Sequence, residues 1–236
     1  MPTDVALALL ATGEIEVVGR LVDASNATLF SQVSGDGLSA ACVYKPVAGE
    51  RPLWDFPDGT LAGREVAAYA VSEATGWDLV PPTVLRDGPY GPGMCQLWVD
   101  VDEEVDLVEL ARSDHVDLQR LVLLDAVVNN ADRKGGHLLP TAAGRVFGVD
   151  HGICFAAEPK LRTLLWQWSG EPLSEEAVDC LARLADAFGA ELGRLLGELL
   201  TPREVVATRR RLNRLIRTGT YPTPSGDWPP IPWPPF

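Results

Sequence analysis

Residues 129–152, NNADRKGGHLLPTAAGRVFGVDHG, contain two aspartates with a predicted hairpin between them. Asp132 lies in a loop after a long apolar stretch, and Asp150 follows 18 residues later at the end of a short strand. The runs HLLPT and RVFGVD flank the turn signal AAGR, so we expect two short strands that bring the aspartates side by side. Phosphoryl transfer requires one carboxylate beside the acceptor hydroxyl and another on a metal that bridges the phosphates. The pair at this spacing therefore predicts a phosphotransfer site.

The first hundred residues predict an antiparallel sheet that carries one helix. β-branched and apolar residues recur in short runs, separated by turn signals such as DASN, SGDG and DGPYGPG. Between them, LAGREVAAYAVSEATG indicates a helix, with Thr60 as its N-cap and Gly76 at its C-terminal side. The expected strands cover residues 13–22, 27–33, 39–47, 81–87 and 93–100.

The second half predicts helices. Apolar residues recur at helical spacing in residues 113–133, and a further helical stretch covers 174–200, with a break near Gly189 or Gly193. Thr201-Pro202-Arg203-Glu204 combines a capping box with proline at the first helical position, so we expect another helix to start there. The six arginines between positions 203 and 217 fit a solvated helix face better than a binding patch.

Residues 218–236, TGTYPTPSGDWPPIPWPPF, form a tail with seven prolines and two tryptophans. Proline lacks a backbone N–H, so this segment cannot form a helix and should be an extended, polyproline-like chain. Either its tryptophans pack onto the domain, or the tail is a linker or a docking peptide for a partner. We favour packing, because two exposed tryptophans would be a liability.

The charge and the apolar content restrict the class of protein. The formal net charge is -13, with 33 acidic residues against 20 basic ones, which argues against nucleic acid as a partner. No apolar run is long enough to cross a bilayer, and the N-terminus lacks the basic start of a secretory signal. The four cysteines are widely scattered and show no metal-like spacing, so we expect free thiols in a reducing compartment. Together these features predict a cytoplasmic protein without a transmembrane segment.

Lysine is rare in this chain, so each lysine is informative. Lys45 is the only lysine in the first 133 residues and lies on a predicted strand, where it would supply a point charge to nucleotide phosphates. The simpler alternative is a solvated surface lysine. Glu65, on the helix that follows, is its natural ion-pair partner, and otherwise a solvated helix residue. Arg133, next to Asp132, either steadies the loop or neutralises charge.

The order of these features resembles that of the protein-kinase-like superfamily. In particular, the chain resembles type II phosphatidylinositol 4-kinases and small bacterial proteins of the phosphatidylinositol 3-/4-kinase-like group. The matching pieces are YKP, REVAAY, VPPT, QLWVD, DAVVNNADR and GVDHGICF, between about residue 20 and residue 155. The resemblance implies a two-lobed α+β protein-kinase-like fold with ATP bound between the lobes. Its expected parts are a sheet-rich N-lobe at 1–100, a helical C-lobe at 101–217 and the tail at 218–236.

The resemblance also implies roles for the two aspartates. Asp132, with Arg133 beside it in the catalytic loop, would be the base or the residue that orients the acceptor, and Asp150 would be the principal metal ligand. A second metal ligand is expected five residues after Asp132, where such kinases usually have asparagine and this chain has His137. Imidazole suits Mn²⁺ better than Mg²⁺, although Mg²⁺ can still be held by Asp150 and phosphates. The implied cofactors are ATP with Mg²⁺ or Mn²⁺.

Neither a Gly-rich loop of the protein-kinase type nor a Walker A motif is present. Instead DASNATLF, residues 23–30, lies where the family has a short phosphate loop, and Ser25, Asn26 and Thr28 would offer donors to phosphate oxygens. The alternative for this segment is an ordinary hairpin turn. The resemblance further implies an adenine-binding hinge made of Gln96, Leu97, Trp98 and the residues up to Asp100.

The sequence therefore favours an ATP-dependent, metal-dependent kinase that moves the γ-phosphate to a hydroxyl. A protein or small-molecule acceptor is favoured over a membrane lipid, because the net charge of -13 repels anionic surfaces and no clear membrane-binding segment is present. The alternative is a nucleotide-binding pseudokinase that acts as a switch or scaffold, with the tail docking a partner. A structural module that binds no nucleotide would leave Lys45 unexplained.

Overall fold

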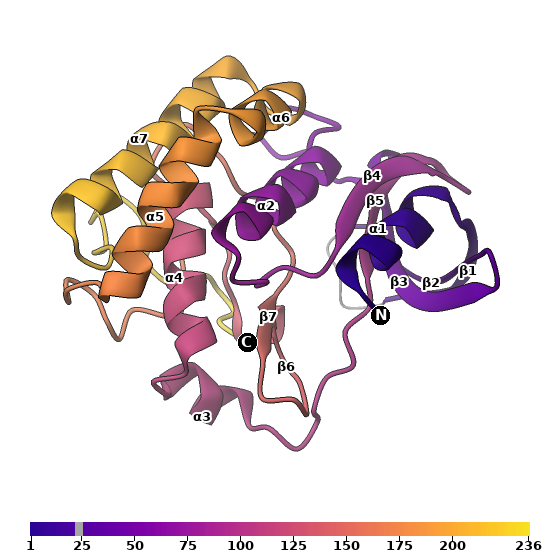
Figure 1. The fold of residues 1–236 in the computed structure, drawn as a ribbon, viewed down its shortest axis with the longest axis horizontal. Coiled ribbons are helices and arrows are strands. Elements are labelled where there is room, and N and C mark those ends of the chain that lie inside the picture. The colour runs from indigo at the N-terminus through magenta and orange to yellow at the C-terminus, as the bar shows by residue number, and fades with distance from the viewer. Residues whose placement is uncertain (22–25) are drawn as a thin grey trace.

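The computed structural model describes residues 1–21 and 26–236. Its first part is a five-stranded antiparallel sheet with the strand order β1-β2-β3-β5-β4, which confirms the five predicted strands (Figure 1). The register places Lys45 on β3 opposite Met94 on β5. The strands are β1 (Glu14–Arg20), β2 (Leu29–Gly35), β3 (Leu38–Pro46), β4 (Thr83–Gly88) and β5 (Gly91–Leu97).

Helix α1 (Thr3–Thr12) lies outside every element predicted from the sequence. Its N-cap position is Pro2, whose side chain cannot accept a hydrogen bond, so the usual start signal is missing. Leu9 and Leu10 are buried with Ile15, Val33 and the cysteines of the sheet in one apolar cluster. Tertiary packing on the sheet therefore stabilises this helix.

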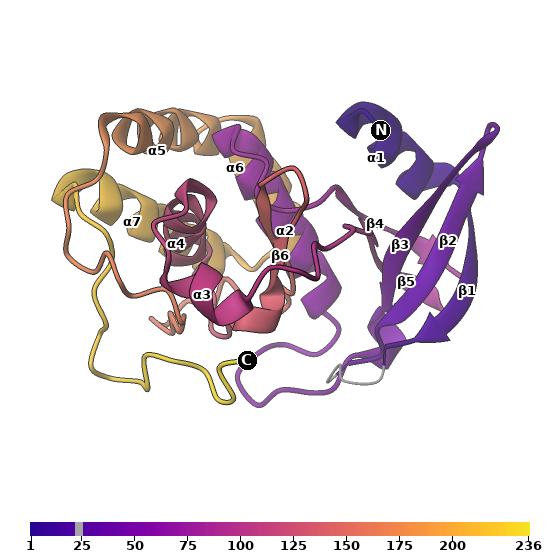
Figure 2. The ribbon, with the colours of Figure 1, turned by 90° about the horizontal axis from the view of Figure 1, so that it is seen from below.

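Helix α2 (Leu61–Thr75) lies between the sheet and the helical part (Figures 1 and 2). It ends at Gly76 in the left-handed conformation, as predicted. The predicted cap was wrong: the Thr60 side chain does not cap α2 and donates to the Pro57 carbonyl. The Glu50 carboxylate caps the helix instead, because it accepts from the backbone N–H groups of Leu61 (3.1 Å) and Ala62 (2.8 Å).

The helical part contains the largest apolar core, and the hairpin of β6 and β7 lies beside α4, as predicted. The expected break in the 174–200 stretch falls at Gly189 and Ala190, between α5 and α6. The capping box at Thr201 is present and starts α7. The bounds are α3 (Leu107–Arg112), α4 (Val116–Val128), β6 (Leu138–Pro140), β7 (Val146–Gly148), α5 (Glu175–Phe188), α6 (Glu191–Leu199) and α7 (Pro202–Thr218), with short 3₁₀ turns at Val47–Gly49 and Gly135–His137.

The tail is extended and contains no helix or strand, as predicted. The expectation that its tryptophans pack onto the domain was wrong for Trp233, which is 85% exposed, while Trp228 is 39% exposed. The tail is attached through the side chain of Tyr221, which lies in the main core, and further along through backbone carbonyls. All four cysteines are free and buried, as predicted. Within the part of the chain that the structure describes, no helix has the length and apolar character of a membrane span.

Candidate active site

Three residues distant in sequence meet where the sheet faces the helical part. Lys45 on β3 binds Glu65 on α2 (Nζ–Oε1, 2.7 Å) and Asp150 just after β7 (Nζ–Oδ1, 2.8 Å). The second oxygen of Glu65 accepts from the backbone N–H of His151 at 2.7 Å, which ties α2 to the segment that carries Asp150. The side chain of Glu65 is 2% exposed and that of Asp150 is 47% exposed. Lys45 and Glu65 thus form the predicted ion pair.

The ion pairs shift the protonation equilibria of this cluster. Burial opposes the charge on Lys45, but the nearby carboxylates of Asp150 and Glu65 outweigh it and raise the pKa of the lysine. Conversely, Lys45 lowers the pKa of Asp150 and outweighs the effect of burial on this carboxyl. Both groups therefore stay charged over the physiological pH range. Asp150 has φ 61°, a left-handed conformation that aspartate adopts more readily than most residues.

His137 lies next to Asp150, with 3.4 Å between its Nε2 and Asp150 Oδ2. Burial lowers the pKa of His137, so its imidazole is neutral and has a lone pair to offer. Its other nitrogen, Nδ1, is buried without a partner. Among residues 1–21 and 26–236 no group of three or more His, Cys, Asp or Glu side chains gathers as a metal cluster. One carboxylate and one neutral imidazole fit a divalent ion whose remaining ligands are phosphate oxygens and water.

Asp132 is partly exposed and forms an ion pair with Lys134, at 2.9 Å between Oδ2 and Nζ. Its backbone N–H donates to the side chain of Asn130, which fixes the start of the loop. Lys134 had no role in the sequence-based prediction, although it is one of only three lysines. It places a positive charge beside the predicted acceptor-orienting carboxylate.

Arg133 is fully buried, so the structure corrects its assignment as a catalytic residue. Its guanidinium binds both oxygens of Asp125 on α4 at 2.9 Å and donates to the carbonyls of Val149 (2.9 Å) and His137 (3.3 Å). A group so enclosed cannot touch a substrate. Of the two roles considered for Arg133, the geometry supports steadying the loop, because one side chain joins α4, the loop and the residue before Asp150.

His151, the middle residue of Asp-His-Gly, is 0% exposed, and its Nε2 lies 2.6 Å from the guanidinium of Arg133. Burial, together with the charge of Arg133, lowers the pKa of His151 well below its ordinary value. The ring is therefore neutral, with Nε2 as the acceptor. His151 is thus packed inside the chain, directly after Asp150.

The predicted phosphate-binding segment gives a mixed result. Ser25 lies outside the described residues. The side-chain oxygen of Asn26 accepts from the backbone N–H of Arg51 at 2.9 Å, and Thr28 is 6% exposed, so the first is used within the chain and the second is enclosed. Asn26 nevertheless lines a cavity of about 20 Å³ together with Lys45, Glu65 and Asp150.

The predicted hinge is also largely engaged within the chain. Gln96 is buried and donates its amide to Thr83 at 2.8 Å, so its side chain does not face the site. The backbone N–H groups of Leu97 and Trp98 donate to Pro82 and Ala41. The ring of Trp98 packs edge-on against Phe30, with 4.9 Å between centroids.

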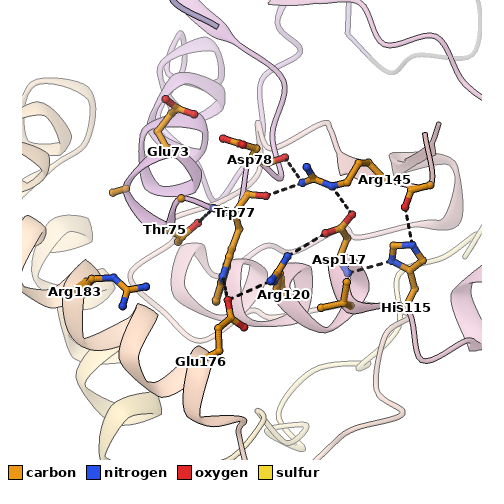
Figure 3. Close-up of a pocket in the computed structure, with 14 residues that line it drawn as sticks. Glu73, Thr75, Trp77, Asp78, His115, Asp117, Arg120, Arg145, Glu176 and Arg183 are labelled. Atoms are coloured by element: carbon orange, nitrogen blue, oxygen red, sulfur yellow. Dashed lines mark hydrogen bonds and ion pairs between the residues drawn. The ribbon is translucent and has the colours of Figure 1, made fainter. Parts of the chain in front are cut away.

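A cavity of about 700 Å³ contains none of the predicted site residues (Figure 3). It lies where the end of α2 meets the starts of α4 and α5. Four of its charged side chains form ion pairs: Arg145 binds Asp117 at 2.9 Å, and Arg120 binds Glu176 at 3.2 Å (Figure 3). We interpret it as a structural ion-pair network rather than a ligand site.

The fold is that of the kinases. The chain matches the structure of the Golgi casein kinase with Mn/ADP bound at a TM-score of 0.61, over 92% of this chain and 75% of that one, with 13% identity. It also matches the Helicobacter pylori proinflammatory kinase CtkA at a TM-score of 0.53, over 90% of this chain and 94% of that one, with 11% identity. These matches confirm the predicted α+β kinase-like fold with a sheet-rich N-terminal and a helical C-terminal part.

Among curated proteins, the chain is 46% identical to Protein Rv2133c of Mycobacterium tuberculosis over 97% of this chain and 95% of that protein, and it belongs to the same family. It is also 26% identical to phosphatidylinositol 4-kinase gamma 4 of Oryza sativa subsp. japonica, over 72% of this chain and 34% of that protein, and so spans about a third of the rice relative. No family model matches the chain. The resemblance to phosphatidylinositol kinases is therefore distant, and what is shown is a kinase-like fold.

Proposed function

We propose that this protein is an ATP-dependent phosphotransferase that moves the γ-phosphate to a hydroxyl acceptor. The observation that carries the proposal is the position of Lys45, bound at once by Glu65 (2.7 Å) and Asp150 (2.8 Å) from three separate elements. A charged lysine held by one buried and one half-exposed carboxylate is suited to the phosphates of a nucleotide and its metal. In a chain with three lysines, a chance surface position does not account for this arrangement.

Each residue of the site has a distinct role in this proposal. Lys45 binds phosphate oxygens, and Glu65 holds the lysine in place. Asp150 and His137 would hold Mg²⁺ or Mn²⁺, and the metal, when bound, would neutralise charge on the phosphates. Asp132 orients the acceptor hydroxyl and accepts its proton as the acceptor oxygen bonds to the γ-phosphorus and the bond to ADP breaks. The Golgi casein kinase of similar fold was solved with Mn/ADP bound, which is compatible with this cofactor set.

The acceptor in this proposal is a protein or a small molecule rather than a membrane lipid. The net charge of -13 opposes approach to an anionic lipid surface. The helix α7 with its arginines has an apolar side within the main core, and Arg211 is used to bind the carbonyls of Val127 and Ala156. These contacts favour the solvated helix face over a lipid-binding patch.

A nucleotide-binding pseudokinase is the second candidate, favoured by groups around the site that are used or enclosed within the chain. The side-chain oxygen of Asn26 accepts from the Arg51 N–H, Thr28 is buried, and the N–H groups of Leu97 and Trp98 donate to carbonyls of the chain. Such a protein would bind the nucleotide and lack appreciable turnover.

Two variants separate the candidates. Asp150→Asn should abolish metal-dependent nucleotide binding, because it removes the charge of the metal ligand, whereas Asp132→Asn should keep binding and lose transfer. Thermal shift with ATP and Mg²⁺ or Mn²⁺ measures binding, and release or transfer of labelled γ-phosphate measures turnover. Asp179→Asn, at an exposed position on α5, is the matched control. Turnover that survives in Asp132→Asn would remove this residue from the mechanism, and binding without turnover in the unmodified protein would favour the pseudokinase.

A further inference from the structure

The tail binds a row of hydrogen-bond donors beside the candidate active site. The carbonyl of Pro230 accepts from Thr163 N and Trp166 Nε1, both at 3.0 Å, and the carbonyl of Pro235 accepts from Gly135 N at 2.8 Å. The carbonyl of Ile231 lies 3.4 Å from the guanidinium of Arg162. We call these four donor residues, Gly135, Arg162, Thr163 and Trp166, the donor strip.

The chemistry of the strip matches an extended, proline-containing polypeptide. All four of its contacts with the tail are donors that bind backbone carbonyls. Five of the nine residues in Trp228–Phe236 are prolines, which keep the carbonyl acceptor but have no N–H that needs a partner. A segment of this kind is already extended, so it loses little conformational entropy on binding. The strip therefore recognises the backbone of such a chain rather than one particular sequence.

Two aromatic residues of the tail contact the domain, although Trp228 is 39% exposed and Phe236 is 51% exposed. The ring of Phe236 packs on Gly135 so closely that a Cβ at this glycine would lie 2.0 Å from the ring. The ammonium of Lys160 lies over the ring of Trp228, 5.5 Å from the ring centroid. Lys160 also forms an ion pair with Asp55 (Nζ–Oδ2, 2.5 Å). Trp233, between the two anchors, is 85% exposed.

The donor strip borders the residues proposed for catalysis. Gly135 lies between Asp132 and His137 in the same loop. Thr163 forms a parallel bridge with Arg133, so the loop and the strip are one backbone unit. In two perpendicular views the C-terminal end of the tail lies beside the hairpin that leads to Asp150 (Figures 1 and 2). The tail therefore contacts, at Gly135, the loop on which an acceptor would have to be oriented.

We propose that the donor strip is the binding face for an extended, proline-containing polypeptide partner, and that residues 228–236 occupy it in cis. That this polypeptide is, or carries, the phosphate acceptor rests on the proposed function. A segment tethered a few residues from its binding face acts at an effective concentration of about 1 mM, so it competes strongly with any free polypeptide. Release of the tail exposes both the strip and Gly135 in the loop that contains Asp132.

The test uses a fluorescent peptide with the sequence of residues 226–236 and measures its anisotropy with the full chain. Phe236→Ala removes one anchor of the tail, so this variant should bind the peptide at least about tenfold more tightly than the unmodified protein. Trp228→Ala provides a second, independent release of the tail. Trp233→Ala is the matched control from the same segment and should bind the peptide as weakly as the unmodified protein. Gly135→Ala, added to Phe236→Ala, should abolish peptide binding because the new Cβ takes the place of the peptide's ring.

Equal peptide affinity for the unmodified protein, Phe236→Ala and Trp228→Ala would overturn the proposal, as would the absence of binding to all of them. These measurements need neither ATP nor turnover, so they separate this inference from the proposed kinase activity. If the phosphotransferase is real, phosphorylation of the bound peptide, or of a peptide carrying serine beside the proline segment, should increase in the anchor variants. Tighter peptide binding without any nucleotide binding would uphold the binding face and refute the kinase function.

Discussion

The buried pair of Arg133 and Asp125 makes the sharpest stability prediction. Both side chains are 0% exposed, and the two hydrogen bonds between them are 2.9 Å long. Arg133→Met removes one partner and leaves Asp125 with only the amide of Asn130 at 2.9 Å. Breaking a buried pair in this way costs about 3–5 kcal/mol, because an uncompensated charge stays in the interior. For a chain of this size, each kcal/mol shifts Tm by about 2–4 °C, so Tm should fall by about 6–20 °C.

The assay is urea and thermal unfolding of a double-mutant cycle. Asp125→Leu combined with Arg133→Met should be less destabilised than the sum of the single variants, with a coupling free energy of about 0.5–3 kcal/mol. Arg194→Met is the control, since its i,i+4 pair with Glu198 is exposed and should contribute about 0.5 kcal/mol or less. A loss in Arg133→Met no larger than in this control would refute the role of Arg133 in holding the loop.

Three further changes have defined outcomes. Lys45→Met should weaken metal-dependent ATP binding at least about tenfold, measured by calorimetry, because it removes the phosphate-facing charge. Folding lowers the pKa of His151, so the unfolded chain binds more protons than the folded one. The free energy of unfolding should therefore decrease as the pH falls below about 6.5, the ordinary pKa of histidine, by at most about 1.4 kcal/mol per pH unit. His151→Asn should flatten this slope, measured by urea unfolding at a series of pH values. Glu50→Ala should destabilise the protein by about 1–2 kcal/mol, since two N–H groups of α2 lose their acceptor.

Two of these changes have a matched control. For the pH profile, the control is His115→Asn. His115 is more exposed than His151 and caps the start of α4, where asparagine is also a good cap, so the pH dependence of stability should persist in this variant. For the helix cap, Thr60→Ala should cost less than Glu50→Ala, because the threonine side chain does not bind the end of α2. Unchanged ATP affinity in Lys45→Met would remove this lysine from the site and weaken the proposed function as a whole.

Local patterns were sufficient to predict the sheet, most of the helices and the central ion pair. Period-two strands, turn signals and the capping box at Thr201 are encoded in neighbouring residues. The proximity of Lys45 to Glu65 followed from a strand and the helix after it. The meeting of Lys45 with Asp150, 105 residues away, agrees with the predicted order of motifs.

The features that the sequence did not reveal depend on contacts between distant segments. Glu50 caps α2 from the far side of a ten-residue loop, so no local capping motif in the sequence predicts this contact. Arg133 follows Asp132 in sequence, yet its side chain points into the core. Its counter-charge, Asp125, is buried on α4, the helix that directly precedes this loop. The tail is held by carbonyl oxygens, which every residue has, so its composition could not say where it binds.

The exposure of the two carboxylates around Lys45 explains why they would differ in role. With His137 neutral, one cation faces two carboxylates, so the cluster of Lys45, Glu65 and Asp150 has a spare negative charge that repels a free triphosphate. In the proposed function, a divalent ion bound with the nucleotide would offset this charge, and it would need a carboxylate that reaches solvent. The side chain of Asp150 is 47% exposed, whereas that of Glu65 is 2% exposed and fixed by the His151 N–H. On these grounds we assign the metal to Asp150 in the proposal, and to Glu65 the role of holding Lys45 in place for the phosphates.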